Sequence, residues 1–391
     1  GSRGLGDVYK RQGQEVEQME RCRVLRIEEQ MYGCEELPEG AEVCCDVTVE
    51  AADGTRKTLS CPDAALIRQG IGEGDRVLWD GMELKKERNS MKKIETSALI
   101  GLGALGILFG RKMPGVKVIA DAGRIARYSA QPVVCNGEEC HFDYVTPEQG
   151  QPVDLLLVAV KATVLEQAIR DMEKFIGPDT IILSVLNGIT SEEDIEAVYP
   201  GHCLWSVAIG MDATRVGRSL TFGAPGRIQF GEKNGEMTDR VRAVDEYLTA
   251  CGIASEPCSD ILFKQWSKLM VNDGLNQAAA AFDLPYGGLT KPGPAYDKML
   301  EAMQEVIDLS VLEGVNLPAD NHKAFLESMA PTFKPDGMPS MRQDVLAQRP
   351  TEVEEFAGVV RRLAKKHGMP TPANDFFYEK IREIEAGYHK E

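Results

Sequence analysis

The chain has 391 residues, which leaves room for two or three domains and a sizeable core. Its formal net charge of −17 argues against nucleic acid as a main partner, because phosphate binding relies on a positive field. No apolar run is long enough to span a bilayer and no signal-peptide pattern opens the chain, so we expect a cytoplasmic protein without a membrane partner. The ten cysteines include no CxxC pair and no histidine-rich spacing accompanies them, so we expect reduced thiols and no metal site.

The first 90 residues differ from the rest of the chain. Residues 1–12 show no hydrophobic period and are set aside in reasoning about the fold. Four short runs are typical of strands, at residues 22–28, 42–50, 58–60 and 76–79. They predict a small β-rich module without a visible catalytic group. Because Met91 resembles the start of a separate protein, residues 1–90 are interpreted either as a fused N-terminal domain or as a readthrough artefact.

A glycine-rich turn follows. The apolar run 98–100 is typical of a buried strand, and Gly101, Gly103 and Gly106 come after it with G-x-G-x-x-G spacing. The first glycine permits a tight turn, the second the approach of a pyrophosphate, and the third the close packing of a helix at 104–112. Such a motif alone is explained equally well by a plain turn.

A second strand, at 116–120, strengthens the case for a dinucleotide site. It ends at Asp121, about 20 residues beyond the first glycine, where an acid that binds a ribose hydroxyl is expected. We therefore interpret the glycine-rich turn as a dinucleotide-binding turn, with its helix N-terminus directed at the phosphates.

Strands and helices alternate from Met91 to about residue 259, which predicts an α/β, Rossmann-like domain with a doubly wound parallel sheet over residues 91–259. The strand signal then disappears, and residues 260–391 are predicted to form an all-helical substrate domain. A cleft between two such domains is a usual position for a substrate site.

Two polar residues follow strands of the predicted sheet. Lys161 comes after the strand at 154–160, and Asn187 with Gly188 comes after the strand at 180–186. Either one alone is explained by an exposed lysine or a plain Asn-Gly turn. Together they are expected to contact a ligand, because ligands bind at the carboxyl ends of parallel strands.

A lysine and two asparagines recur every four residues in the predicted helix 262–282. Lys268, Asn272 and Asn276 would line one helix face over two turns, with apolar residues around them. A solvated polar stripe is the alternative, but such a stripe more often carries Glu, Lys or Gln than Asn. Buried asparagines need polar partners, and a polyol or oxo acid would supply them.

Two further polar residues lie near the C-terminus. Ser340 begins the run SMRQD, and Glu352 ends the run RPTE. Thr351 with Glu354 fits a capping box for a helix predicted at 351–367, which leaves Glu352 without a structural duty.

From Met91 to the C-terminus the chain resembles the ketopantoate reductase (2-dehydropantoate 2-reductase) family. The resemblance rests on GLGALG at 101–106, VKA at 160–162, LNG at 186–188, WSKL at 266–269 with Asn272 and Asn276, SMRQD at 340–344 and RPTE at 349–352. It implies an NADP-dependent oxidoreductase that reduces a 2-oxo acid, with ketopantoate to pantoate, on the route to pantothenate and coenzyme A, as the first expectation.

The resemblance also implies roles for single residues. Lys268 is expected to be the general acid, giving a proton to the C2 carbonyl oxygen as the nicotinamide gives its hydride to C2. The expected substrate-binding residues are Asn187, Asn272, Asn276 and Ser340. The expected cofactor-binding residues are Gly101, Leu102, Gly103, Ala104, Leu105, Gly106, Lys161, Asn187 and Glu352.

The sequence departs from the family pattern at two positions. Asp121 stands where an arginine often meets the 2′-phosphate of NADP, which favours NAD, while Arg124 and Arg127 lie close enough to compensate. Tyr286 stands where another small polar substrate contact is expected. The alternatives are a reductase of another 2-oxo or 3-hydroxy acid and a non-catalytic nicotinamide-sensing protein, and a homodimer is left open.

Overall fold

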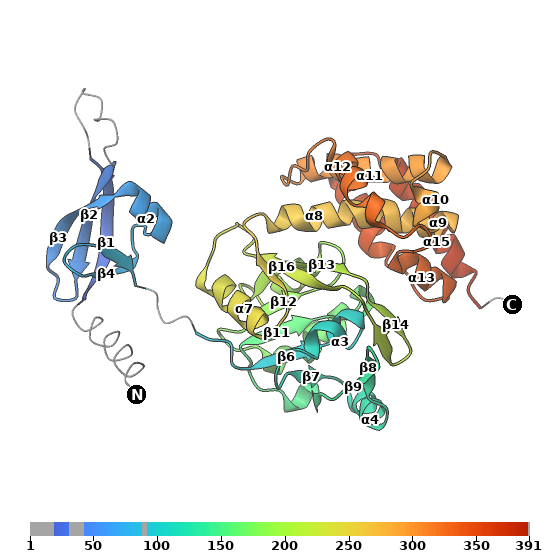
Figure 1. Ribbon diagram of the computed structural model, residues 1–391, viewed down its shortest axis with the longest axis horizontal. Helices are drawn as coiled ribbons and strands as arrows, with labels where there is room; N and C mark the ends of the chain where they lie inside the picture. Colours follow the sequence, from blue (N-terminus) through green and yellow to red (C-terminus); the bar gives the residue numbers. More distant parts are fainter. Residues whose placement is uncertain (1–18, 31–42, 88–91, 390–391) are drawn as a thin grey trace, which may run out of the picture. The chain divides into compact units, whose positions relative to one another are not determined.

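The computed structural model describes residues 19–30, 43–87 and 92–389. The chain forms two compact units, Gly1–Met91 and Lys92–Glu391 (Figure 1). Residues 1–12, and residue 42 at the start of the strand expected at 42–50, lie outside the described residues.

The described part of the first unit is a five-stranded antiparallel sheet with one helix. The strand order is β3-β2-β1-β4-β5. The elements are β1 (Glu20–Glu29), β2 (Cys44–Ala51), β3 (Arg56–Pro62), α2 (Asp63–Gln69), β4 (Arg76–Trp79) and β5 (Leu84–Lys86). The β-rich prediction is confirmed. Helix α2 was not predicted, because it buries only Leu66 and therefore shows no hydrophobic period.

The second unit begins with an eight-stranded sheet of order β10-β7-β6-β11-β12-β13-β16-β17. The first six strands in this order are parallel, β16 is antiparallel to β13, and β17 is parallel to β16. The strands are β6 (Ser97–Ile100), β7 (Lys117–Ile119), β10 (Asp143–Val145), β11 (Leu155–Val158), β12 (Ile181–Ser184), β13 (Cys203–Met211), β16 (Pro225–Gly231) and β17 (Ser255–Pro257). The chain winds outward from β6 in both directions, so a ligand-binding crevice is expected at the carboxyl ends of β6 and β11. The predicted Rossmann-like sheet is confirmed.

Helices cover both faces of this sheet, which explains why its central strands are apolar throughout. Leu99 and Leu155 face the core that α3 (Ala104–Gly110) and α7 (Asp239–Ala250) share with the sheet. On the other face Leu156 packs with α5 (Leu165–Asp171) and α6 (Ser191–Glu196). Several smaller elements were not predicted. A separate four-stranded sheet consists of three-residue strands, which carry little periodic signal: β8 (Val133–Cys135), β9 (Glu138–Cys140), β14 (Thr214–Val216) and β15 (Ser219–Thr221). The others are helix α4 (Ala122–Ala130) and the short 3-10 turns η1 (Pro147–Gln149), η2 (Ala162–Val164), η3 (Glu173–Phe175) and η5 (Ala330–Thr332).

The rest of the second unit is helical, as predicted. Helix α8 leaves the sheet and enters the group of C-terminal helices (Figure 1). The elements are α8 (Ile261–Val271), η4 (Asn272–Asn276), α9 (Gln277–Phe282), α10 (Tyr286–Leu289), α11 (Pro294–Leu312), α12 (Asn321–Ser328), α13 (Ser340–Leu346), η6 (Glu354–Gly358), α14 (Val359–Lys366) and α15 (Pro372–Ala386).

Two π-helical turns occur where continuous α-helices were predicted. The helix expected at 262–282 is interrupted by η4, and the helix expected at 351–367 starts only at Glu354, with η6 as its first turn. A π-turn adds one residue to a helical turn, so it departs from the 3.6-residue period and has no capping motif that would predict it from the sequence. Such turns are frequent at functional sites. The capping box is also absent, because the Thr351 hydroxyl donates to Glu385 at 2.6 Å while Glu354 accepts from Tyr378 at 2.7 Å.

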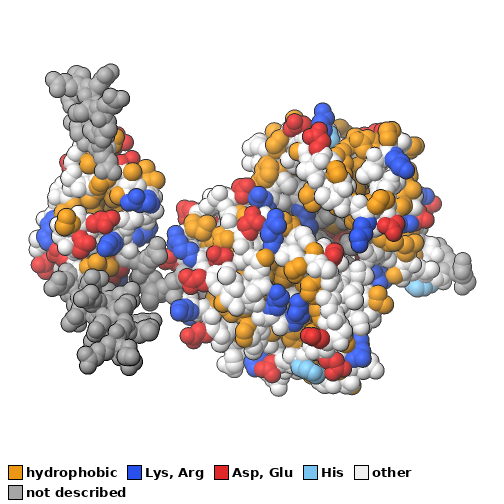
Figure 2. Space-filling model, viewed as in Figure 1, with side chains coloured by type: hydrophobic (Ala, Val, Ile, Leu, Met, Phe, Trp, Pro, Cys, Tyr) orange, Lys and Arg blue, Asp and Glu red, His pale blue; other side chains and the backbone are white. Residues whose placement is uncertain are grey.

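The surface of the second unit mixes charges of both signs. On the face shown in Figure 2, lysine and arginine side chains are interspersed with acidic and apolar ones. Among the described helices, none has both the length and the apolar character required to span a bilayer.

Candidate active site

The glycine-rich turn has the geometry that its spacing predicts. Gly101 follows β6 with φ +100°, and a Cβ there would lie 2.5 Å from the Ala159 carbonyl oxygen. A Cβ on Gly106 would lie 1.9 Å from the Gly101 oxygen, so the packing of α3 on the turn excludes any side chain. At Gly103 the nearest atom would be 3.7 Å away. The first and third glycines are thus required by the fold, while the space beside the second is open, at the N-terminus of α3 where a pyrophosphate is expected.

A cavity of about 110 Å³ lies beside this turn, at the carboxyl end of β7. Its lining includes Gly101, Asp121, Arg124 and Asp171. Asp121 is the N-cap of α4: its Oδ1 accepts from the Arg124 N–H at 2.8 Å, and its Oδ2 lies 3.5 Å from Arg124 Nε. The hydrogen bond from the Arg124 amide lowers the pKa of Asp121, so this carboxylate stays ionised at the cavity rim.

A row of hydrogen-bonded side chains joins three of the predicted site residues, Lys268, Asn187 and Glu352. Lys268 Nζ on α8 donates to Asn187 Oδ1 at 2.9 Å and to the Ala208 carbonyl at 2.6 Å. Asn187 Nδ2 donates in turn to Glu352 Oε2 at 3.1 Å. The orientation of the Asn187 amide is fixed by its neighbours, because its oxygen must face the ammonium and its nitrogen the carboxylate. These hydrogen bonds hold in one row three residues that are far apart in the chain: Asn187 is 81 positions from Lys268 and 165 positions from Glu352.

Burial tunes the two charged ends of this row. Desolvation lowers the pKa of the Lys268 ammonium to about 8, and the negative charge of Glu352 opposes that shift. Desolvation likewise raises the pKa of Glu352, while the Asn187 hydrogen bond and the Lys268 charge act in the other direction. An amine that titrates near neutral pH suits a proton donor.

A buried carboxyl group, Glu192, is hydrogen-bonded to α8 one turn before Lys268. Glu192 accepts from the Ser206 N–H at 3.1 Å and from Gln265 Nε2 at 2.9 Å, and Gln265 also donates to the Ser206 carbonyl at 2.9 Å. Gln265 and Lys268 lie one turn apart on α8. They therefore donate hydrogen bonds to the carbonyl groups of alternate residues of β13, Ser206 and Ala208. Burial raises the pKa of Glu192 to about 7. The sequence analysis did not identify Glu192 as a residue near the site.

The two asparagines of η4 are buried next to one another. Asn272 and Asn276 are each 8% exposed, and Asn276 Nδ2 donates to Asn272 Oδ1 at 3.2 Å. Asn272 Nδ2 is buried without a hydrogen-bond partner in the described chain. The predicted burial is confirmed, and an unsatisfied buried donor suits the oxygen of a ligand.

The remaining predicted residues lie around these two groups. Ser340 is exposed at the first position of α13, a helix that contacts η4 and α9. Lys161, after β11, lies 3.9 Å from Asp344, and Asp344 accepts from Arg349 Nε at 2.8 Å. The ring of Tyr286 stacks on Phe333 with centroids 4.4 Å apart, so in this structure it serves packing.

Two family profiles match most of the second unit. "Ketopantoate reductase PanE/ApbA" matches residues 97–235, and "Ketopantoate reductase PanE/ApbA C terminal" matches residues 260–385. The chain belongs to the ketopantoate reductase family. Its curated relatives include the 2-dehydropantoate 2-reductases of Lactococcus lactis, 25% identical over 73% of this chain and 97% of the relative, and of Vibrio cholerae, 27% identical over 61% and 79%.

Solved structures share the fold of this ketopantoate reductase family member. D-mandelate dehydrogenase with NADH and anilino(oxo)acetate has a TM-score of 0.66 at 24% identity, covering 74% of this chain and 99% of that one. The 2-dehydropantoate 2-reductase of Methylococcus capsulatus has a TM-score of 0.65 at 20% identity, over 76% and 98%. The dimeric ketopantoate reductase of Staphylococcus aureus has a TM-score of 0.64 at 19% identity, over 74% and 99%.

One basic residue near the glycine-rich turn was missed by the sequence analysis. Arg215, on the hairpin of β14 and β15, donates from Nη1 to the Leu102 carbonyl oxygen. It brings a guanidinium to the turn on which the pyrophosphate is expected. A single arginine in a short hairpin carries no sequence signal of that role.

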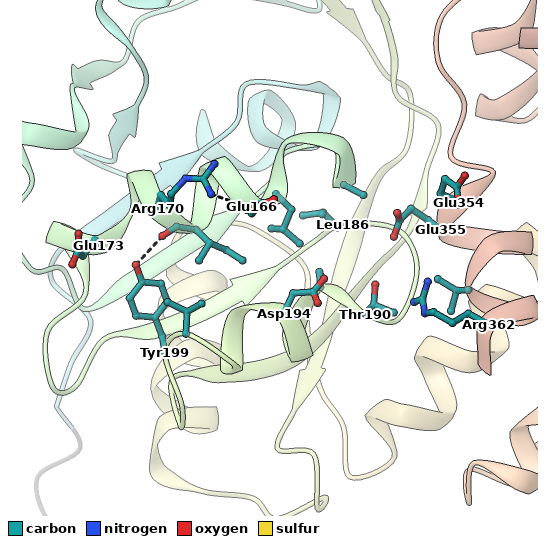
Figure 3. A pocket seen from close by; sticks show the side chains of 16 residues that line it. Glu166, Arg170, Glu173, Leu186, Thr190, Asp194, Tyr199, Glu354, Glu355 and Arg362 are labelled. Carbon is teal, nitrogen blue, oxygen red and sulfur yellow. Dashed lines mark hydrogen bonds and ion pairs between the residues drawn. The ribbon is translucent and has the colours of Figure 1, made fainter. Parts of the chain in front are cut away.

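A larger cavity lies elsewhere in the described part of the second unit. It measures about 1130 Å³ and is lined by α5, α6, η6 and α14, with Asp194, Glu355 and Arg362 facing into it (Figure 3). It contains neighbours of the predicted residues, such as Leu186 and Ala162, but not Lys268, Asn187 or Glu352 themselves. Cavity size alone would therefore have directed attention away from the polar row of Lys268.

Proposed function

We propose that this protein reduces a 2-oxo acid with a nicotinamide cofactor, and that ketopantoate is its substrate and pantoate its product. The observation that carries the proposal is the Lys268 ammonium. Two of its three N–H donors are used by Asn187 and Ala208, and within the described chain the third remains for the oxygen of a ligand. The names of the curated relatives support this choice of substrate.

When bound, the nicotinamide supplies a hydride for C2 of the substrate. Hydride addition places negative charge on the C2 oxygen, which Lys268 stabilises and then neutralises by giving up one proton. Asn187 holds the ammonium in position, and the Glu352 charge keeps it protonated at neutral pH. After the step Lys268 is neutral and regains its proton from water.

We propose that η4 and α13 bind the rest of the substrate. The unpaired Nδ2 of Asn272 suits a carboxylate or hydroxyl oxygen, Asn276 lies beside it, and Ser340 stands on the helix that packs against them. The glycine-rich turn, Lys161 and Glu352 are proposed as cofactor contacts, with Arg215 as an additional one.

The cofactor has two candidates. The family resemblance favours NADPH, while the cavity at Asp121 favours NADH, because two carboxylates and one guanidinium leave its rim negative. D-mandelate dehydrogenase, which has the same fold, is described with NADH. We therefore propose NADH as the preferred cofactor, with NADPH accepted less well. We also propose that the protein is cytoplasmic and that it forms a homodimer. Light scattering, which measures the molar mass in solution, tests the dimer.

The test is a panel of 2-oxo acids with NADH and NADPH, followed by the loss of nicotinamide absorbance. Ketopantoate should give the highest kcat/KM. A higher value for another 2-oxo acid would reassign the substrate, and no turnover with any acid would favour a sensing role.

A further inference from the structure

Between the two asparagines of η4 lies a carboxyl group that the proposed mechanism does not use. Asp273 is fully buried. Gln277 Nε2 donates to its backbone oxygen at 2.7 Å and to its Oδ1 at 2.9 Å. Its Oδ2 is buried without a hydrogen-bond partner in the described chain. An ionised carboxylate would have one oxygen with no donor, which is costly in a dry interior.

A second buried carboxyl group, Glu305 on α11, has taken the donors of this region. It accepts from the backbone N–H of Ala373 at 2.7 Å, the backbone N–H of Asn374 at 3.0 Å and Asn374 Nδ2 at 2.7 Å. The two backbone donors belong to the first turn of α15, whose dipole favours negative charge. The side-chain oxygen of Asn374, in contrast, is buried without a donor.

Two carboxyl groups in one dry cluster do not both ionise. Glu305 has three donors and Asp273 has one, so the charge belongs on Glu305. We propose that Asp273 is a neutral carboxylic acid in the working protein, that its proton is hydrogen-bonded within this cluster with the Asn374 oxygen as acceptor, and that it thereby positions η4. One shared proton supplies a partner for both unsatisfied oxygens.

The charges around Asp273 agree with this state. Burial and the negative charge of Glu305 raise the pKa of Asp273 well above its ordinary value, whereas the neighbouring Asn374 amide and the hydrogen bond from Gln277 act in the lowering direction. Glu305 is the ionisable neighbour from α11, and Asp375 of α15 acts on Glu305 in turn. Among the described groups that act on Asp273, none is basic.

The neutral acid matters because η4 carries Asn272 and Asn276. A Cβ on Gly274 would lie 2.5 Å from Met303 Cγ, so η4 packs tightly on α11 and has little freedom to shift. Gln277 joins Asp273 to η6 by accepting the Ala357 N–H at 3.2 Å. As a positioning residue for the substrate asparagines, Asp273 acts only if the proposed function holds, whereas its protonation state does not depend on that function.

The protonation state is tested first by infrared spectroscopy on the full-length protein. Asp273→Asn keeps the size of the side chain and offers an amide N–H where the acid offers its O–H. The difference spectrum of wild type against this variant at pH 7 should contain the carbonyl band of a protonated carboxylic acid. The matched control, Asp308→Asn on the exposed side of α11, should show a carboxylate band instead. A carboxylate band for Asp273 would overturn the proposal.

Stability supplies a second readout with a defined sign. Folded Asp273 keeps a proton that the unfolded chain releases above about pH 4, so its contribution to the folding constant falls by up to tenfold per pH unit until the folded group ionises. Asp273→Asn lacks this contribution, and its thermal midpoint should rise relative to wild type between pH 5 and 8. A difference that does not change with pH would contradict a neutral Asp273.

The positioning role has its own measurement. Asp273→Asn should keep KM for the oxo acid within about threefold, while Asp273→Ala should raise it at least tenfold with a smaller effect on kcat. Equal KM values in both variants would overturn the positioning role. If no 2-oxo acid is reduced at all, the proposed function fails, and the infrared and thermal measurements still decide the state of Asp273.

Discussion

Removing the charge of Glu352 should shift the pH dependence of catalysis without removing a hydrogen bond. In Glu352→Gln the new amide oxygen can still accept from Asn187 Nδ2, which now lies 3.1 Å from the carboxylate. What disappears is the negative charge that supports protonation of Lys268. The descending limb of the kcat/KM profile, which reports the free enzyme, should therefore move to lower pH.

The size of this shift follows from the row of three side chains. The Asn187 amide and its two hydrogen bonds separate the ammonium and the carboxylate by roughly 7 Å, which at an effective dielectric constant of about 20 gives an attraction of about 2 kcal/mol, or a shift of about 1 to 2 pH units. The wild-type limb should lie near the Lys268 pKa of about 8.

The assay is initial-rate reduction of the oxo acid at saturating cofactor from pH 6 to 10. The matched control is Glu355→Gln, which removes a carboxylate three residues further along and should leave the limb in place, because Glu355 does not act on the Lys268 pKa. If the limb stays at the wild-type pH in Glu352→Gln, or moves equally in both variants, the reasoning about the Lys268–Glu352 pair is refuted.

Four further outcomes are expected. Lys268→Ala should lower kcat by about 10²-fold or more, with little change in cofactor affinity measured by fluorescence titration, and wild-type turnover would remove it from the mechanism. Asn276→Ala and Ser340→Ala should mainly raise KM for the oxo acid, since they delete ground-state contacts; loss of cofactor binding alone would contradict the assignment. Asp121→Ala should increase kcat/KM for NADPH, because it removes a negative charge near the expected 2′-phosphate. The substitution also removes the N-cap of α4. A decrease in kcat/KM would place Asp121 away from the 2′-phosphate. A chain that starts at Met91 should keep steady-state constants within about twofold, because the second unit contains every proposed site residue. Activity that returns only when residues 13–90 are restored would contradict this.

The sequence was informative where a local backbone requirement fixes the residue type. Gly101 and Gly106 could be predicted because no side chain fits where they stand, and the apolar strands could be predicted because both faces of the sheet are covered. The burial of Asn272 and Asn276 followed from the apolar residues around them. In each case the decisive information lies within one turn or one strand.

Long-range contacts explain what the sequence did not reveal. Glu192 looks like an ordinary first-turn acid, and only the arrival of Gln265 and β13 turns it into a buried support for α8. Asp121 was expected to bind a ribose, and the structure adds that it caps α4, a helix without buried residues that the sequence analysis did not predict. Arg215 reaches the glycine-rich turn from a hairpin 113 residues away in the chain.

The two π-turns show how such contacts shape the proposed active site. Residues in an α-helix at i and i+4 would share a face, but one extra residue in η4 and another in η6 shift the registers of both segments. Gln277 connects these turns, since its amide nitrogen holds Asp273 and its oxygen accepts from Ala357. One turn carries Asn272 and Asn276, and the other begins two residues after Glu352. The geometry of both sides of the proposed site therefore depends on one buried glutamine, whose role no periodic pattern in the sequence can express.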